Sequence, residues 1–125
     1  MGSDETVPSF QLMVKVREVR RLALSLPEAS EEGHHGIPSF RVAKRIFATV
    51  PDDQHLHVMV GPDETDMAVS TAPHAVEELW WGKRLAGVRV NLAAANLDLL
   101  TVLLSEAWRR KAPRRLVSPF NSSNK

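Results

Sequence analysis

The chain has 125 residues, which is long enough for one domain with its own hydrophobic core. Apolar residues make up 43% and charged residues 25%, as in ordinary globular proteins, and the formal net charge of +1 does not by itself imply a polyanionic partner. The lack of cysteine excludes disulfides, thiolate nucleophiles and cysteine-based metal sites. No apolar stretch approaches the ~20 residues of a membrane-spanning helix. No secretory signal is visible at the N-terminus, so we expect a cytoplasmic protein.

A helix is predicted over residues 8–26, where apolar side chains recur at the i, i+3, i+4, i+7 spacing. Pro27 ends it, because the residue before a proline avoids the α region. From Glu31 to Val60 the apolar period changes to two, which predicts strands and tight turns. The predicted strand segments are residues 31–35, 39–43, 45–50 and 56–60.

The hairpin over residues 39–50 leaves open which of its faces is buried. Regular alternation places four side chains on one face, namely Phe40, Val42, Phe47 and Thr49. It places four others on the opposite face, namely Arg41, Ile46, Ala48 and Val50. Both sets contain apolar side chains, so the pattern alone does not select the face that meets the core.

In the second half of the chain, a short helix is predicted over residues 63–70, with acids in its first turn. A second hairpin follows, with strands over residues 75–81 and 87–92. The last predicted helix covers residues 96–111, with Asn96 as its N-cap and a basic run at its C-terminus.

This order of elements predicts an α+β fold. It consists of an N-terminal helix, an antiparallel β-meander, a short helix, a second β-hairpin, and a C-terminal helix packed on one sheet face. We expect a single domain over residues 8–118. Residues 1–7 and 119–125 are expected to be disordered tails.

Several motifs resemble the MmcQ/YjbR family. Residues 33–42 and 46–48 resemble its first hairpin, and residues 24–29 the end of its first helix. Residues 81–84, 87–92, 100–108 and 111–116 resemble its C-terminal half. The resemblance extends from about Val16 to Leu116, and it implies the same α+β fold.

Members of this family are commonly labelled as DNA-binding on account of a double-wing surface, although most are biochemically uncharacterised. The resemblance therefore implies a DNA-binding role. Two departures from the family pattern bear on that role. Ala43-Lys44-Arg45 replaces the usual glycines of the first turn and adds charge to it. Leu85-Ala86 stands where an aromatic residue usually follows the second turn, which removes a ring.

The charges of the chain are segregated, although they nearly cancel. Residues 33–51 contain three bases and no acid, and residues 79–115 contain eight bases and two acids. Such segregation shapes the surface potential more than the total charge does. The candidate DNA-binding residues are Arg41, Lys44, Arg45, Lys83, Arg84, Arg89, Arg114 and Arg115.

Ordinary explanations exist for the same residues. Charged hairpin tips aid solubility and discourage edge pairing. The run Arg109-Arg110-Lys111 complements the dipole at a helix C-terminus.

Trp80 and Trp81 are adjacent on a strand, so one ring should face the core and the other should not. An outward ring would stack on a base, contact a partner or cover part of the terminal helix. The alternative function is therefore a protein- or small-ligand-binding module that uses the sheet face and Trp80/Trp81.

Catalytic motifs are absent from the sequence. It contains no G-x-S-x-G, no glycine-rich phosphate loop and no H-E-x-x-H. His55 and His57 share one strand face, as a metal-binding pair would, but the chain lacks cysteine and other convincing ligands. We therefore predict a non-enzymatic protein without cofactor or metal.

Overall fold

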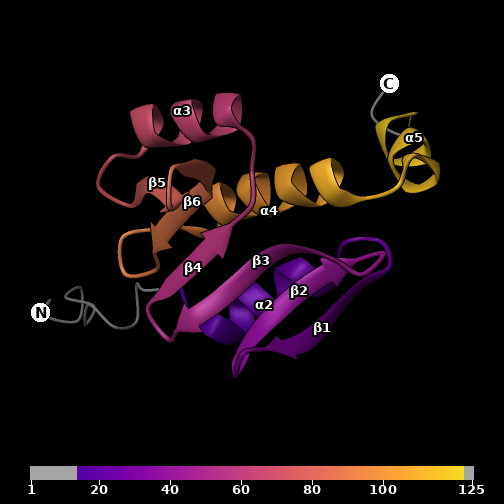
Figure 1. The fold of residues 1–125 in the computed structure, drawn as a ribbon, viewed down its shortest axis with the longest axis horizontal. Helices are drawn as coiled ribbons and strands as arrows, with labels where there is room; N and C mark the ends of the chain where they lie inside the picture. Colours follow the sequence, from indigo (N-terminus) through magenta and orange to yellow (C-terminus); the bar gives the residue numbers. More distant parts are fainter. Residues whose placement is uncertain (1–13, 123–125) are drawn as a thin grey trace, which may run out of the picture.

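The computed structural model describes residues 14–122 and confirms the predicted α+β class (Figure 1). The strands form one antiparallel sheet in the order β1-β2-β3-β4-β6-β5. They are β1 (Ala29–His34), β2 (Ile37–Val42), β3 (Arg45–Asp52), β4 (His55–Val58), β5 (Val76–Trp81) and β6 (Arg84–Asn91). The helices of this part of the chain are α2 (Val16–Leu24), α3 (Pro62–Thr71), α4 (Leu97–Lys111) and α5 (Arg114–Ser122).

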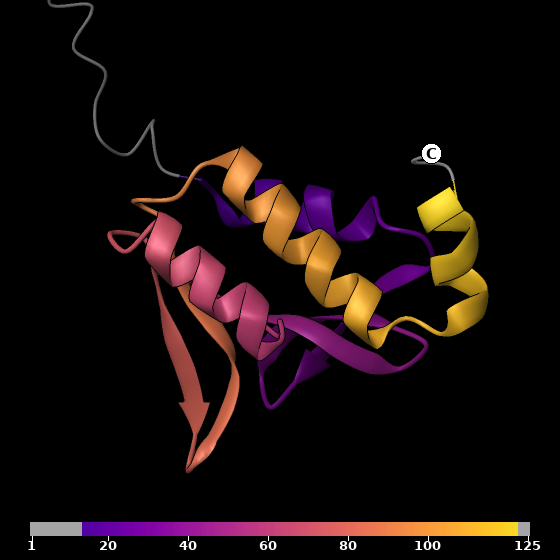
Figure 2. The same ribbon diagram turned by 90° about the horizontal axis from the view of Figure 1, so that it is seen from above.

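Helices α2, α3 and α4 lie on the same side of the sheet, as the view from above shows (Figure 2). Helix α4 crosses the central strands and carries a fully buried stripe that includes Leu100, Leu104 and Trp108. From the sheet, side chains such as Phe40 and Leu56 complete the core. Burying these side chains between the two layers supplies the main driving force for folding. Within residues 14–122, α2, α3 and α4 leave the opposite sheet face uncovered.

A β-bulge at Phe47 decides which face of the first hairpin is buried. Phe40 pairs with Ala48, and Arg41 pairs with Ile46, so Phe47 is an extra residue on β3. One extra residue interrupts the regular alternation of side chains. Phe47 and Ala48 are therefore both buried, whereas Ile46 lies beside Arg41 on the outward face.

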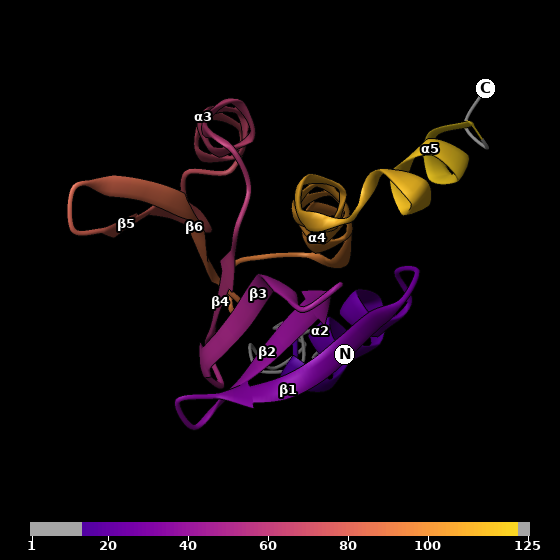
Figure 3. The ribbon, with the colours of Figure 1, turned by 45° about the vertical axis from the view of Figure 1, so that its right-hand side comes forward.

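The turns of the two hairpins lie at the same end of the sheet. Strands β2 and β5 run in the same direction, because each is separated from β4 by a single antiparallel neighbour. The turn after β2 and the turn after β5 therefore lie at corresponding ends of their strands. The sheet twists strongly, so that hairpin β5–β6 diverges from strands β1, β2 and β3 (Figure 3).

The prediction for the tryptophan pair is wrong. Trp80 is 50% exposed and Trp81 is 52% exposed, so neither ring enters the core. The register of β5 against β6 shifts between Leu79 and Trp80, and this irregularity breaks the alternation on which the prediction depended. Two large aromatic rings consequently lie at the surface of one hairpin.

Helix α5 is an element that the sequence analysis did not predict. Pro113 follows the end of α4 and directly precedes α5, and its carbonyl oxygen accepts from the N–H groups of Leu116 and Val117 in the first turn of α5. Leu116 and Val117 pack against the core, and Arg115 pairs with Glu28 at 3.0 Å. The helix continues to Ser122, into the segment expected to be a tail.

At the other end of the chain, helix α2 begins at Val16. The first part of the predicted N-terminal helix, residues 8–13, and the expected tail, residues 1–7, lie outside the described residues. No helix within residues 14–122 has the length and apolar character needed to cross a bilayer.

Candidate nucleic-acid interface

A cleft of about 580 Å³ lies between the two hairpins, and we call it the hairpin cleft. The first hairpin contributes one side, the second hairpin contributes the other, and the C-terminus of α4 reaches its margin. The cleft is lined by His34, Ile37, Arg41, Lys44, Ile46, Thr49, His57, Met59, Trp81, Arg84, Ala86 and Lys111.

The outward face of the sheet forms the floor of the hairpin cleft. Arg41 pairs with Ile46, and Thr49 pairs with His57, and residues directly opposite one another share a face of the sheet. Ile46 lies opposite Arg41 with or without the bulge, whereas the extra residue at Phe47 brings Thr49, instead of Ala48, to this face. A floor of mixed polar and apolar side chains is thus produced by strand register and by one extra residue.

The hairpin cleft concentrates positive charge. Four permanent cations line it, and they come from three separate segments of the chain: Arg41, Lys44, Arg84 and Lys111. Among the described residues, no carboxylate lines this cleft. Arg41 has an acidic partner outside the lining, because Oε1 of the exposed Glu32 lies 3.8 Å from Nη1 of Arg41.

Lys111 is affected both by burial and by its cationic neighbours. Burial lowers the pKa of its ammonium, and the charges of Arg45, Arg110 and Arg84 lower it further. Arg45 also donates from Nη1 to the Lys111 carbonyl oxygen at 3.4 Å, which brings the two basic segments together. Like charges this close repel one another, so an anion bound in the cleft would relieve an unfavourable interaction.

Trp81 provides the cleft with an aromatic side. The guanidinium carbon of Arg84 lies 6.0 Å from the centre of its ring, at the outer limit of a cation–π contact. Trp80 differs from it, because its Nε1 donates to Oε1 of Glu78 at 3.0 Å and its ring does not line the cleft. The two tryptophans are therefore equally exposed but have different surroundings.

The candidate DNA-binding residues from the sequence separate into distinct groups. Arg41, Lys44 and Arg84 line the hairpin cleft, and Arg45 lies at its margin beside Lys111. Lys83 is in the exposed turn after β5 and is not a lining residue.

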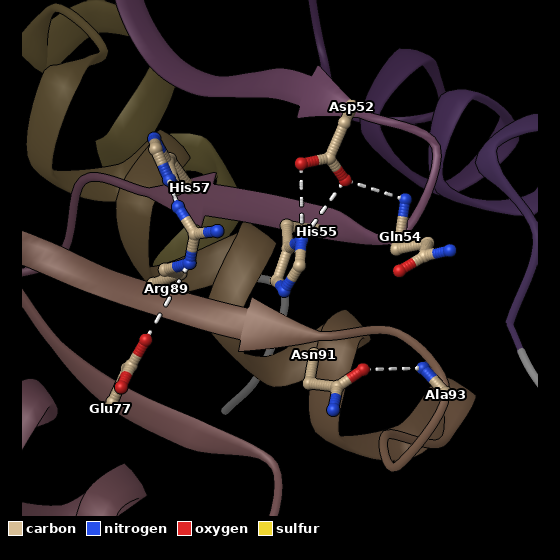
Figure 4. Close-up of polar contacts among 8 residues, drawn as sticks. All are labelled: Asp52, Gln54, His55, His57, Glu77, Arg89, Asn91 and Ala93. Atoms are coloured by element: carbon tan, nitrogen blue, oxygen red, sulfur yellow. Dashed lines mark hydrogen bonds and ion pairs between the residues drawn. The ribbon is translucent and has the colours of Figure 1, made fainter.

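Three further candidates lie away from the cleft lining. Arg89 contacts His57 and Glu77 (Figure 4), Arg115 pairs with Glu28, and Arg114 does not line the cleft. Lys111 is not among the eight candidates, although it belongs to the basic C-terminal segment from which Arg114 and Arg115 were chosen. Its place at the C-terminus of α4, beside the hairpins, is what brings it to the cleft.

The histidines of β4 make separate polar contacts (Figure 4). His55 Nδ1 lies 3.0 Å from Oδ1 of Asp52, and the hydrogen bonds from Gln54 N–H and from His55 hold the pKa of the Asp52 carboxyl below its usual value. His57 faces Arg89 instead. Within residues 14–122, no group of three or more potential metal-binding side chains is present.

His57 is expected to make stability depend on pH. Burial lowers the pKa of its imidazole, Arg89 and His55 lower it further, and Asp52 opposes them. Nη1 of Arg89 donates to Nε2 of His57 at 3.1 Å, which requires a neutral ring.

Because the pKa is lower in the folded state, the unfolded chain binds this proton more readily, and stability falls as pH is lowered through the unfolded-state pKa near 6.5. We predict that acidification from pH 7.5 to 5.5 costs wild type more free energy of unfolding than it costs His57→Gln. Urea denaturation of both proteins across that range measures the difference. Parallel curves would contradict the prediction.

A second cavity, between α3 and α4, has the opposite charge. It measures about 670 Å³, and its lining is mainly apolar, with acids at Asp63, Glu64, Asp98 and Glu106. No lysine or arginine of the described chain lines it. A polyanion would therefore be repelled from this groove and attracted to the hairpin cleft.

The comparisons with known proteins agree with this architecture. The YjbR family model matches residues 24–110, a range that contains both hairpins. The crystal structure of Deinococcus radiodurans protein DR2400, which carries the domain DUF419, superposes with a TM-score of 0.68 over 87% of this chain and 89% of that chain. The two sequences are 18% identical, so this likeness concerns the fold alone. No curated protein sequence matches the chain significantly.

Proposed function

Because this chain belongs to the YjbR family, whose model spans most of its length, we propose that it is a non-enzymatic DNA-binding protein that holds the phosphate backbone in the hairpin cleft. The observation that carries the proposal is the convergence of four cations on one cleft whose described lining contains no acid. Oppositely charged partners are steered to such a surface, and phosphate contacts supply affinity without sequence preference.

Each cation has a position suited to phosphate contact. Arg41 and Lys44 belong to the first hairpin, Arg84 to the second and Lys111 to the end of α4, so a strand running along the cleft would meet all of them. Neutralising these side chains releases counterions from the DNA, which makes the affinity fall steeply with salt. Arg114 and Arg115 are not part of this contact set.

The proposal is tested by removing two cleft cations together, in the variant Lys44→Ala/Arg84→Ala. We expect its affinity for a fluorescein-labelled oligonucleotide to fall roughly tenfold at low salt. The slope of log K against log salt should shrink by about 1.5, since each lost phosphate contact removes roughly 0.7–0.9. Fluorescence anisotropy over a salt series, with the DNA supplied once as a single strand and once as a duplex, measures both quantities.

The matched control is Arg114→Ala/Arg115→Ala, which lowers the net charge by the same amount outside the cleft. Arg115 is already paired with Glu28, so we expect this variant to bind within about twofold of wild type. Equal losses in the two double variants would contradict the role of the cleft. Lack of binding by wild type to either form of DNA at low salt would refute the proposed function.

The second candidate function is a small-ligand- or protein-binding module that uses the sheet face with Trp80 and Trp81. The volume of the hairpin cleft, about 580 Å³, falls within the 300–1,000 Å³ typical of small-molecule pockets. Two exposed tryptophans on one hairpin also suit a contact surface. This function would be favoured if neither form of DNA bound.

A further inference from the structure

Trp81 is a large apolar side chain held at the surface beside concentrated positive charge. Its ring is 52% exposed and lines the hairpin cleft. Trp108, by contrast, is fully buried and donates to the Pro27 carbonyl oxygen. An aromatic ring next to a basic groove is the combination with which proteins bind single-stranded nucleic acid, because bases stack on the ring while cations follow the backbone.

The groups around Trp81 complement the two parts of a nucleotide. Arg84 lies 6.0 Å from the ring centre, and Lys44 lines the same cleft from the other hairpin. A nucleotide joins a flat base to a charged phosphate, so a ring with adjacent cations complements both parts. We infer that the hairpin cleft takes single-stranded DNA, with a base stacked on Trp81 and flanking phosphates bound by Arg84 and Lys44; this inference rests on the proposed function.

A duplex does not use these groups in the same way. Its base faces are covered by neighbouring bases, so Trp81 would reach one only after costly unstacking. The cations also line a concave space of about 580 Å³ between the hairpins, while Lys83, at the outer turn, is not part of it. Arg41 and Lys111 are half-buried, and cations in such positions meet the thin backbone of one strand more readily than the wide surface of a double helix.

The test compares Trp81→Ala with Trp80→Ala on a dT oligonucleotide and on a duplex with the same number of phosphates. We expect wild type to prefer the single strand. Trp81→Ala should lose about tenfold in affinity for the single strand while keeping the wild-type salt slope, since stacking involves no counterion release. Trp80→Ala should bind like wild type, because that ring is equally exposed but lies outside the cleft.

Two further measurements separate stacking from a structural role. Trp81→Phe keeps an aromatic ring and should retain most of the single-strand affinity. Tryptophan fluorescence should be quenched when the single strand binds, and the quenching should persist in Trp80→Phe and be lost in Trp81→Phe.

The failures of the two proposals are distinguishable. If the duplex binds as tightly as the single strand and both tryptophan variants bind alike, the inference is wrong and DNA binding by the cleft still stands. If neither form binds, the proposed function fails and the inference fails with it.

Discussion

Replacing Gly87 with alanine is expected to cost about 3 kcal/mol or more of folding stability. Gly87 lies on β6 with a φ of +152°, a conformation that side-chain-bearing residues rarely adopt. A Cβ there would lie 2.1 Å from the Val58 carbonyl oxygen and 3.0 Å from the Met59 Cα. Both obstacles are backbone, and Met59 N–H is bonded to the Phe47 carbonyl oxygen, so they cannot move aside cheaply.

The same substitution should disturb the hairpin cleft. Gly87 directly precedes the part of β6 that pairs with β4. A shift of the backbone there would therefore move Trp81 and Arg84, at the end of the second hairpin, relative to the first hairpin. Urea denaturation measures the loss of stability, and single-strand affinity at a temperature where the variant is still folded measures the displacement.

Gly82→Ala is the matched control for Gly87→Ala. Its φ is +64°, but a Cβ there meets nothing within 4 Å, so only the backbone penalty of about 1 kcal/mol applies. Equal destabilisation by the two variants would show that the close approach of β4 is unimportant.

Replacing Trp108 with alanine is expected to destabilise the protein by about 3–5 kcal/mol. The side chain is fully buried on α4, and its Nε1 donates to the Pro27 carbonyl oxygen at 2.9 Å. Its removal leaves a large cavity and takes a partner from a backbone acceptor. Because Trp108 lies one turn before Lys111, the loss should also loosen the segment that brings this cation to the cleft.

Guanidinium-induced unfolding of Trp108→Ala provides the measurement. Val102→Ala is a control on the same helix, because Val102 is 58% exposed and its truncation should change stability by no more than about 0.5 kcal/mol. Trp108→Phe keeps most of the buried volume and should fall between the two. A loss of less than about 1 kcal/mol in Trp108→Ala would contradict the central role of this side chain in the core.

Most helices and strands of the fold could be read from local pattern. The strands around Leu56 and Val90 alternate cleanly, and Asn96 caps α4 by accepting from Leu99 N–H, as its position predicted. Helix α5 was missed because Pro113 and a basic segment indicated a helix end and a solvated tail. The helix is nevertheless held by packing of Leu116 and Val117, which is a tertiary effect.

The candidate site was less predictable than the fold. Eight bases were singled out by charge, yet Arg89 and Arg115 are engaged by Glu77 and Glu28, while Lys111 joins the cleft from a helix end. Which partner a base meets depends on residues far away in the chain. Glu28 and Arg115, for example, are 87 positions apart.

Periodicity, turn residues and charge are local properties, so they predict the class of fold, the approximate helices and strands, and the segments in which positive charge is concentrated. The three-dimensional arrangement alone shows that Arg41, Lys44, Arg84 and Lys111 share one cleft and that Trp81 faces it. The physical reason is that strand order brings both turns to one end of the sheet, while single-residue register shifts at Phe47 and before Trp80 change the direction of the side chains that follow.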